Sequence, residues 1–548
     1  RHHHRFGHQL LSGPADEAAL SAETPSSSPA PAAGPTGSDV PETARVVLLG
    51  SVFLVASCGL VYELVAGAVS SYLLGDAVTQ FSLVIGVFMC SMGVGSFLAQ
   101  FIERQLLRTF VELEIWLGLL GGLSSLGMFA VSAWASAVFV PFFYGLCAVL
   151  GILIGIEIPL LVRILGDRAG GGGGVGKALS HVLALDYLGA LGGSILFPFV
   201  VLPWLGLVRA SVLFGVMNLA VAAAGLRIVP GARWGMGLRL GGAAGVLVAA
   251  FFGSATWIGL LEDRLYQDEV VFAQDTPYQR IVLTRWREDV RLYLNGHLQF
   301  SAVDEARYHE SLVVPAMEAS RARSVLILGG GDGLALREVL KYPQVESVTL
   351  VDIDPAVTEL ASRHPVLRQL NGESLASPKL TVHHRDAMGF LEQDREFYGA
   401  VLIDLPDPST PTLSKLYSRP FYALVARRLS ESGVMVTQAT SPFFARRAFW
   451  CIVKTIENAV EPAELGLRTA PYRVHVPSFG EWGFVLASRR EIDGAALPVS
   501  VDTRFLSREV LPGLFAFGGD IARVDTEVNR LDDPILHRYY ERGWQSFN

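Results

Sequence analysis

The sequence predicts a multi-span α-helical membrane domain, then a small antiparallel β region, then an α/β domain. Of its 548 residues 51% are hydrophobic and 18% are charged, and the mean hydropathy of +0.39 is high for a soluble enzyme. The charges are unevenly spread, with 17 in the 215 positions from 46 to 260 and 79 in the other 333. Beyond residue 261, short apolar strands alternate with helical stretches. The length also allows more than one domain.

The N-terminal segment, residues 1–44, is rich in Pro, Ala, Ser and Gly and contains the run SSSPAPAAGPTGSDVPE. It has too little apolar content to form a core, so we expect a disordered tail. The formal net charge of the whole chain is -8, and its pI is about 5.9. This acidic balance gives no sign of a nucleic-acid partner.

Residues 45–262 are predicted to form the transmembrane domain, with the lipid bilayer as their partner. A helix needs about 20 apolar residues to cross a hydrocarbon core of about 30 Å. The longest stretch without a charge, residues 115–156, predicts a helical hairpin that turns near Pro141 or a little before it. We expect about seven helices, since the other apolar stretches are residues 46–75, 77–102, 187–208, 210–226 and 240–261.

Three carboxyl groups lie inside or at the edge of these spans, on Glu63, Glu157 and Asp186. An ionised carboxylate is costly in hydrocarbon, so such residues usually face a bundle interior or a water-filled cavity. Two interpretations stay open. The residues form an intramembrane polar site for a cationic ligand, or they make hydrogen bonds between helices near the membrane interface.

The basic residues of the loops give a prediction of sidedness. With seven spans, the loops after the second, fourth and sixth span carry eight basic residues, and the other three loops carry only Arg209. The positive-inside rule then places those loops and the N-terminus in the cytoplasm. An odd number of spans would leave the C-terminal half outside.

The C-terminal half begins with a small β region, residues 266–315. Its segments RIVLTRW and VRLYLNGHLQF predict antiparallel strands with a turn at Asn295–Gly296. Residues 320–490 then alternate apolar strands with helices, which predicts a mainly parallel sheet covered by helices on both faces. Residues 491–548 are predicted as a C-terminal tail.

Acidic residues and glycines follow the predicted parallel strands, where ligands bind in such folds. The first strand is followed by Gly329, Gly330, Gly331, Asp332 and Gly333, and the later strands by Asp352, Asp386, Asp404 and Asp407. Asp352 has the spacing of an acid that binds a ribose hydroxyl pair. The glycine run contains no basic residue and Asp332 would repel a pyrophosphate, so the set favours a cationic ligand. Helix capping is the alternative, and it would serve for one or two of the five acids.

The segment GGGDGLALREVLKYPQVESVTLVDIDPAV resembles the signature of the spermidine synthase (polyamine aminopropyltransferase) family. The motifs YQRIVLTR, LNGHLQF, DEARYHES and DLPDPS follow the order of that family, over about residues 266–490. The apolar half and the segment RVDTEVNRLDDPILHRYYERGW resemble its membrane-integrated bacterial branch. The resemblance implies a Rossmann-like (methyltransferase-type) catalytic domain and a homo-oligomer, a dimer.

The resemblance also implies an activity. The enzyme would transfer the aminopropyl group of decarboxylated S-adenosylmethionine, a co-substrate, to putrescine or a related amine. The products would be spermidine or a related polyamine and methylthioadenosine, with no prosthetic group and no metal. Asp332 would bind the amine of the donor and repel the α-carboxylate of intact S-adenosylmethionine. The implied donor-binding residues are Gln279, Gly329, Gly331, Asp332, Asp352, Asp386 and Ala387.

For the acceptor, the resemblance implies that Asp404 orients and deprotonates the attacking amine with help from Tyr308. His309 and Asp407, together with Asp332, would hold the amine groups. The segment HVPSFGEWGF departs from the family, because Phe479 stands where soluble relatives commonly place a tyrosine. Phe479 either contacts the substrate or packs in the core, and this leaves the acceptor open.

Two other functions remain as alternatives. One is a methyltransferase-like enzyme that uses intact S-adenosylmethionine, against which Asp332 speaks. The other is a polyamine transporter or sensor with a regulatory nucleotide-binding domain, suggested by Glu63, Glu157 and Asp186. Because the donor is made in the cytoplasm, the resemblance places the catalytic domain there, attached to a multi-pass domain in the cell (inner) membrane, against the charge of the loops.

Overall fold

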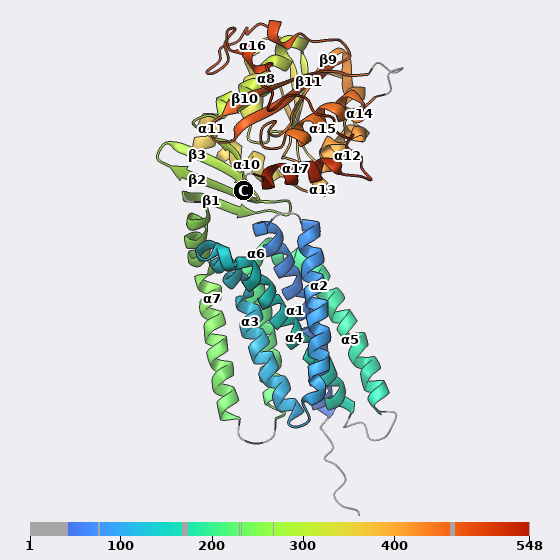
Figure 1. Ribbon diagram of the computed structural model, residues 1–548. Coiled ribbons are helices and arrows are strands. Elements are labelled where there is room, and N and C mark those ends of the chain that lie inside the picture. The colour runs from blue at the N-terminus through green and yellow to red at the C-terminus, as the bar shows by residue number, and fades with distance from the viewer. Residues whose placement is uncertain are drawn as a thin grey trace, which may run out of the picture. The chain divides into compact units, whose positions relative to one another are not determined.

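The computed structural model describes residues 42–546 apart from 75–76, 167–173, 230, 232, 267 and 461–465 (Figure 1). Residues 1–41 of the predicted tail therefore lie outside the described residues. The prediction is wrong for residues 42–44, because the first helix already begins at Glu42. This polar first turn precedes the apolar residues of the same helix.

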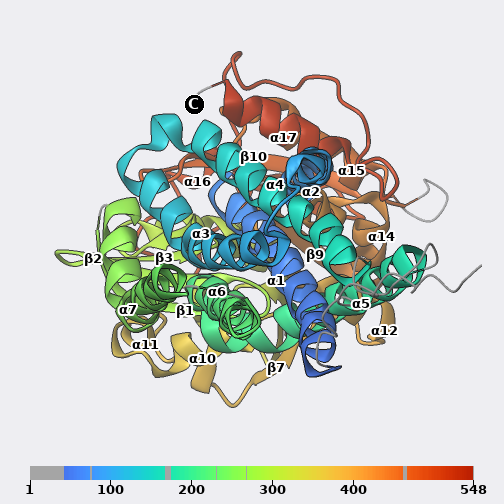
Figure 2. The ribbon, with the colours of Figure 1, turned by 90° about the horizontal axis from the view of Figure 1, so that it is seen from below.

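The apolar half is a bundle of long helices, seen from the side in Figure 1 and end-on in Figure 2. The predicted hairpin turns at residues 135–138, a little before Pro141. A Cβ atom on Gly95 would lie 2.1 Å from the carbonyl oxygen of Ile152, so two of the helices touch backbone to backbone. The helices are α1 (Glu42–Leu74), α2 (Ala77–Leu98), α3 (Leu106–Trp134), α4 (Phe139–Gly166), α5 (Gly174–Leu196), α6 (Leu202–Leu226) and α7 (Trp234–Tyr266).

Six of the described helices are long and apolar enough to cross a membrane, where the sequence predicted about seven. The difference lies in residues 176–226, where the sequence predicted two spans, residues 187–208 and 210–226, and the six helices include these 51 residues as one. The backbone is not helical at Gly206 (φ 69°, ψ 177°), after a π-helical turn at Phe197–Val201, so this segment consists of two helical parts that meet at a kink. Its two arms, α5 and α6, have different neighbours, since Gly189 of α5 lies against α1 and Gly215 of α6 against α3.

A four-stranded antiparallel sheet follows, with its strands in chain order: β1 (Glu269–Asp275), β2 (Arg280–Trp286), β3 (Asp289–Leu294) and β4 (His297–Ser301). The predicted turn is present, with φ of 51° at Asn295 and 79° at Gly296. Ile281, Leu283 and Phe300 pack with Leu334 and Val357 of the next domain. The small sheet therefore shares a core with the domain that carries the site.

The second sheet has seven strands in the order β10-β11-β9-β8-β5-β6-β7. The central five strands are parallel, and β10 and β11 are antiparallel. The predicted Rossmann-like fold is confirmed. The strands are β5 (Ser324–Gly329), β6 (Ser347–Asp352), β7 (Leu380–His384), β8 (Tyr398–Asp404), β9 (Leu429–Gln438), β10 (Arg468–Val476) and β11 (Gly480–Ser488).

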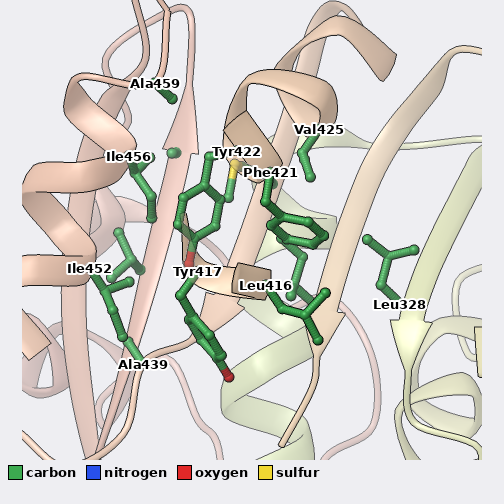
Figure 3. Close-up of a cluster of buried hydrophobic side chains, with 14 of the residues drawn as sticks. Leu328, Leu416, Tyr417, Phe421, Tyr422, Val425, Ala439, Ile452, Ile456 and Ala459 are labelled. Carbon is green, nitrogen blue, oxygen red and sulfur yellow. The ribbon is translucent and has the colours of Figure 1, made fainter. Parts of the chain in front are cut away.

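Apolar side chains on both faces of this sheet pack against helices. On one face, Phe421 of α14 (Arg419–Arg428) and Ile452 of α15 (Arg446–Glu457) belong to the same buried cluster as Leu328 of β5, with Phe421 lying between the other two (Figure 3). The other face is covered by α8 (Glu305–Ser320) and α9 (Leu334–Leu340). The remaining helices of the domain are α10 (Pro355–Arg363), α11 (Pro365–Leu370), α12 (Ala387–Gln393), α13 (Pro411–Ser414), α16 (Leu511–Leu514) and α17 (Ile535–Gln545).

Two predicted boundaries need correction. Residues 305–315 were assigned to the small β region but begin α8, because Leu312, Val313 and Met317 form an apolar helix face that packs on the large sheet. The predicted C-terminal tail also joins the core. Leu511 packs on one face of the sheet, and Leu536 of α17 is fully buried on the other.

Candidate active site

The glycine loop after β5 lies against the ends of two neighbouring strands. Gly329, Gly330 and Gly333 have φ of 83°, 64° and 80°, values that side chains rarely allow. A Cβ atom on Gly329 would lie 2.0 Å from the carbonyl oxygen of Asp404. The amide of Gly331 donates to Asp352 Oδ2 at 3.0 Å. The loop therefore packs too closely for side chains against the ends of β6 and β8, and it joins the acids of these strands.

Asp352 ends β6, and its second oxygen accepts a bond from the amide of Asp354 at 2.9 Å. Burial raises the pKa of Asp352, and the two backbone donors partly offset this effect. Gln279 lies nearby, where its side-chain amide donates to Asp354 Oδ2 at 3.0 Å. Asp354 also caps α10 through the amide of Ala356. Sequence reasoning missed Asp354, which fixes the orientation of Gln279.

Asp386 and Ala387 lie at the start of α12, after β7. Asp386 Oδ2 accepts the amide of Gly389 at 2.9 Å, and Lys415 pairs with its other oxygen at 3.1 Å. The capping alternative therefore holds for Asp386, whose side chain remains 38% exposed. Ala387 is buried against the apolar core.

Asp332, Asp404 and Tyr308 meet between the glycine loop and α8. The Tyr308 hydroxyl donates to Asp404 Oδ1 at 2.7 Å. A Cβ atom on Gly330 would be 3.3 Å from the other Asp404 oxygen. Burial raises the pKa of Asp332 to about 6, and the nearby Asp404 adds to this rise while His309 opposes it. Burial likewise raises the pKa of Asp404, against the effects of His309 and Tyr308.

His309 lies beside this pair and is 2% exposed. Its Nδ1 atom is 3.0 Å from the carbonyl oxygen and 3.0 Å from Oε2 of Glu305. Burial alone would lower the pKa of His309, but the bond to Glu305 and the charges of Asp332 and Asp404 raise it to about 9. His309 is therefore a cation at neutral pH and favours the charged forms of both aspartates.

Glu305 was not predicted as a site residue, although it lies in the DEARYHES motif. Arg337 holds both of its carboxylate oxygens, at 3.0 and 2.9 Å. Burial would raise the pKa of Glu305, but His309 and Arg337 lower it to about 2. Glu305 thus remains charged and fixes His309 beside the two aspartates.

Asp407 lies after the end of β8 and accepts several hydrogen bonds. Gln438 Nε2 donates to Oδ1 at 3.2 Å, and Thr440 Oγ1 donates to Oδ2 at 3.1 Å. The hydroxyl of Tyr540 in α17 also lies near Asp407. Burial raises the pKa of Asp407 to about 6, and these three polar groups limit the rise. Sequence reasoning missed all three residues.

Phe479 lies in the turn between β10 and β11, next to the acidic pocket. Its ring centroid is 6.0 Å from that of Tyr308 and 5.2 Å from that of Trp482. The ring therefore contacts the residue that donates to Asp404, and it also packs against the domain core.

The carboxyl groups of the bundle form a separate group. Glu157 of α4 is 1% exposed and lies within electrostatic reach of Glu114 of α3, which the sequence analysis did not single out. Asp186 of α5 lies within electrostatic reach of Glu157. Glu63 lies instead near Cys147. The structure thus brings two of the three predicted residues together and adds Glu114.

A Rossmann-like sheet with one acid at the end of β6 and three half-buried acids and a tyrosine beside it has the features of a transferase that binds cationic substrates. The described residues contain no group of three or more His, Cys, Asp or Glu side chains placed to hold a metal ion. Residues 305–494 match the model of the spermine/spermidine synthase domain.

Similar proteins extend this match to nearly the whole chain. Polyamine aminopropyltransferase 2 of Ralstonia nicotianae is 46% identical over 510 residues, which are 91% of this chain and 98% of the relative. The polyamine aminopropyltransferase of Leptospira interrogans is 46% identical over 505 residues, covering 91% and 99%. The chain belongs to the polyamine aminopropyltransferase (spermidine synthase) family.

Solved structures resemble the catalytic part. A crystal structure of spermidine synthase in complex with the transition-state analogue AdoDATO is 25% identical, with a TM-score of 0.42, and covers 45% of this chain and 85% of the other. The spermidine synthase of Thermotoga maritima is 25% identical, with a TM-score of 0.41, and covers 45% and 84%.

Proposed function

We propose that this aminopropyltransferase acts at a membrane and transfers the aminopropyl group to putrescine or a related amine. The observation that carries the proposal is the Tyr308–Asp404 pair beside Asp332 in the pocket of the glycine loop. Two acids there favour two amines, one on the donor and one on the acceptor. Asp352, Gln279, Asp386 and Ala387 would hold the nucleoside part of the donor.

The chemical step needs a neutral amine nitrogen. An alkylammonium group has an unperturbed pKa near 10, so a base must take its proton before it attacks. Asp404 would accept that proton while Tyr308 fixes the carboxylate. The nitrogen then forms a bond to the carbon beside the sulfonium, and the C–S bond breaks. Methylthioadenosine leaves as a neutral thioether, so the remaining catalysis is in-line positioning.

Asp332 would select the decarboxylated donor over intact S-adenosylmethionine. A carboxylate at this position attracts the amine of decarboxylated S-adenosylmethionine and repels the α-carboxylate of the intact form. His309 fits an indirect role better than contact with the acceptor, because a buried imidazolium repels a second cation. We therefore propose that it balances the charge of Asp332 and Asp404.

One assay tests the proposal against a methyltransferase. The purified full chain is incubated with each of the two sulfonium donors and a panel of diamines and polyamines, and methylthioadenosine is quantified. We expect methylthioadenosine only from the decarboxylated donor, with the fastest release for a short diamine. Its absence with every amine would refute the activity, and release of S-adenosylhomocysteine would favour the methyltransferase.

We further propose that the helices span the inner membrane, with the catalytic domain on the cytoplasmic side and a homodimer as the working unit. The six long apolar helices support insertion into a membrane. The cytoplasmic origin of the donor supports a cytoplasmic location of the catalytic domain. Protease accessibility of the catalytic domain in right-side-out and inverted vesicles tests the sidedness. Cleavage in right-side-out vesicles alone would contradict it, and the mass of the detergent-solubilised protein tests the dimer.

The bundle supports a second candidate function, the passage of a polyamine or another cation. The specific observation is the Glu114–Glu157 pair, which is buried among apolar helices. Both Glu114 oxygens and Glu157 Oε1 have no hydrogen-bond partner among the described residues. Proteoliposomes should take up labelled polyamine, and Glu157→Gln should abolish this uptake. Uptake that the variant leaves unchanged would dismiss transport.

A further inference from the structure

Thr440, two residues after the end of β9, has a backbone conformation that threonine rarely adopts. Its φ is 54°, in the left-handed region that a β-branched side chain disfavours. Six non-glycine residues in the described part of the chain have a positive φ; Thr440 is fully buried, whereas the other five are exposed. Such strain persists only where the surroundings hold it, and it is frequent at functional sites.

Hydrogen bonds on both sides of Thr440 hold this conformation. Its carbonyl oxygen accepts the amide of Gly483 in β11 at 2.7 Å. A Cβ atom on Gly483 would lie 3.0 Å from that oxygen and closer still to the ring of Phe449, so β11 leaves no room for a side chain there. The Thr440 amide donates to Oε1 of Gln438 at 3.0 Å, and Nε2 of Gln438 donates to the Leu405 carbonyl oxygen at 2.7 Å. The segment after β9 is therefore fixed from both neighbouring strands.

The same conformation closes a ring of hydrogen bonds at Asp407. Gln438 Nε2 donates to Asp407 Oδ1 at 3.2 Å, and Thr440 Oγ1 donates to Asp407 Oδ2 at 3.1 Å. The bond from the Thr440 amide to Gln438 completes the ring, so each carboxylate oxygen has its own donor. Rotation about the N–Cα bond sets the angle between the amide and the side chain of Thr440, and the ring therefore depends on the positive φ. A carboxylate offers about four acceptor positions, so the ring leaves others open for a substrate.

We propose that Thr440 is a positioning residue of the acceptor site, where its strained backbone directs the hydroxyl to Asp407 and fixes this carboxylate for an ammonium group of the amine substrate. A carboxylate that is fixed in advance binds an ammonium group with less loss of freedom. The inference rests on the role that the proposed function gives to Asp407. It also accounts for a threonine at a position where glycine would be free of strain.

Three substitutions in the full chain separate the hydroxyl from the strain. Thr440→Ser keeps the hydroxyl, Thr440→Ala removes it and keeps the strain, and Thr440→Gly removes both. We expect Thr440→Ala and Thr440→Gly to raise the KM for the amine about tenfold, because a hydrogen bond to a charged group is lost. Thr440→Ser should stay within threefold of the wild type. In all three variants kcat at saturating amine and the KM for the donor should change less than threefold.

Thermal unfolding separates positioning from a structural role. Glycine adopts a positive φ freely, so Thr440→Gly should melt at a higher temperature than Thr440→Ala, although both bind the amine equally weakly. With a merely structural role, the more stable glycine variant would bind the amine more tightly than the alanine variant. Thr284→Ala is the control, since Thr284 is buried in β2 and its hydroxyl has no partner among the described residues. It should leave both KM values within twofold of the wild type.

Equal KM values of Thr440→Ser and Thr440→Ala for the amine would overturn the inference. In an Asp407→Asn background Thr440→Ala should have less than a twofold further effect, and an effect as large as in the wild type would also overturn it. If Thr440→Ala fails to fold, Thr440→Gly takes its place in both comparisons.

Failure of the proposed function looks different, because the wild type itself would then form no methylthioadenosine with any amine. In that case calorimetry of putrescine binding to the wild type, Thr440→Ser and Thr440→Ala, each saturated with methylthioadenosine, still measures the role of the hydroxyl. We expect Thr440→Ala to bind putrescine about tenfold more weakly than Thr440→Ser. Equal affinities of these two variants would overturn the inference.

Discussion

The catalytic pocket and the helical bundle both bury carboxyl groups, but they surround them differently. In the pocket, three acids have a polar partner from another element: Tyr308 for Asp404, Gln438 for Asp407, and a backbone amide for Asp352. In the bundle, both Glu114 oxygens and Glu157 Oε1 have no hydrogen-bond partner among the described residues.

This difference in hydrogen-bond partners affects what each region is able to bind. Donors and the imidazolium of His309 favour the charged forms of the pocket acids, so the pocket remains anionic and attracts amines. The bundle pair lacks such donors, and uncompensated carboxylates are costly among apolar helices. Variants in each region test how independent the two regions are.

The largest effect is expected for Asp404→Asn. Removal of the general base should lower kcat about a thousandfold, within the range for such groups. Donor binding should remain within threefold of the wild type, because the amide keeps the shape of the side chain. Methylthioadenosine release and donor titration measure the two quantities. Asp525→Asn, at a side chain that is 94% exposed, is the control, and equal turnover of the two variants would refute the role of Asp404.

Asp332→Asn should lower kcat/KM for the decarboxylated donor about a hundredfold, because an ammonium loses a buried ionic partner. The affinity for intact S-adenosylmethionine should fall less or rise, since the repulsion of its carboxylate is removed. The ratio of the two affinities, measured by calorimetry, should drop at least tenfold. A constant ratio would show that another residue selects the donor.

His309→Gln should reduce activity about tenfold at pH 6.5. The imidazolium lowers the pKa of Asp404, so its loss raises that pKa and moves the acid limb of kcat/KM to higher pH by about one unit. Rates measured between pH 5 and 9 test this shift. His475→Gln, at a side chain that is 62% exposed, should show the wild-type profile. If both variants show that profile, His309 does not balance the charge of the pocket.

The raised pKa of His309 also predicts that the stability of the fold depends on pH. The pKa of His309 rises on folding from 6.5 to about 9. A raised pKa stabilises the fold fully below pH 6.5, and this contribution, about 3 kcal/mol, is lost as the pH rises through 9. The melting temperature of the wild type should therefore exceed that of His309→Gln at pH 6 and approach it above pH 9. A constant difference would argue against the charged imidazole.

Local sequence patterns were sufficient to predict which site residues lie at the ends of the parallel strands. The carboxyl ends of parallel strands share one edge, so Asp332, Asp352 and Asp404 could be placed together without a structure. Tyr540 could not, because it lies 133 positions from Asp407 and meets it only through the packing of α17 on the core. Glu114 was missed for another reason. The sequence analysis placed Glu114 just outside a predicted span, because the stretch without charges begins at residue 115. In the structure α3 begins at Leu106, so Glu114 lies inside the helix and is buried in the bundle.

The smallest effect is expected for Glu157→Gln in the bundle. An amide at this position carries N–H donors and no charge, so the fold should lose little stability. Turnover of the catalytic domain in detergent should stay within twofold of the wild type, because the pocket acids have partners of their own. The matched change Glu112→Gln affects a residue that pairs with Arg239 at an exposed position and serves as the control. A loss of turnover in Glu157→Gln alone would show that the bundle acids and the pocket are coupled, and it would overturn their independence.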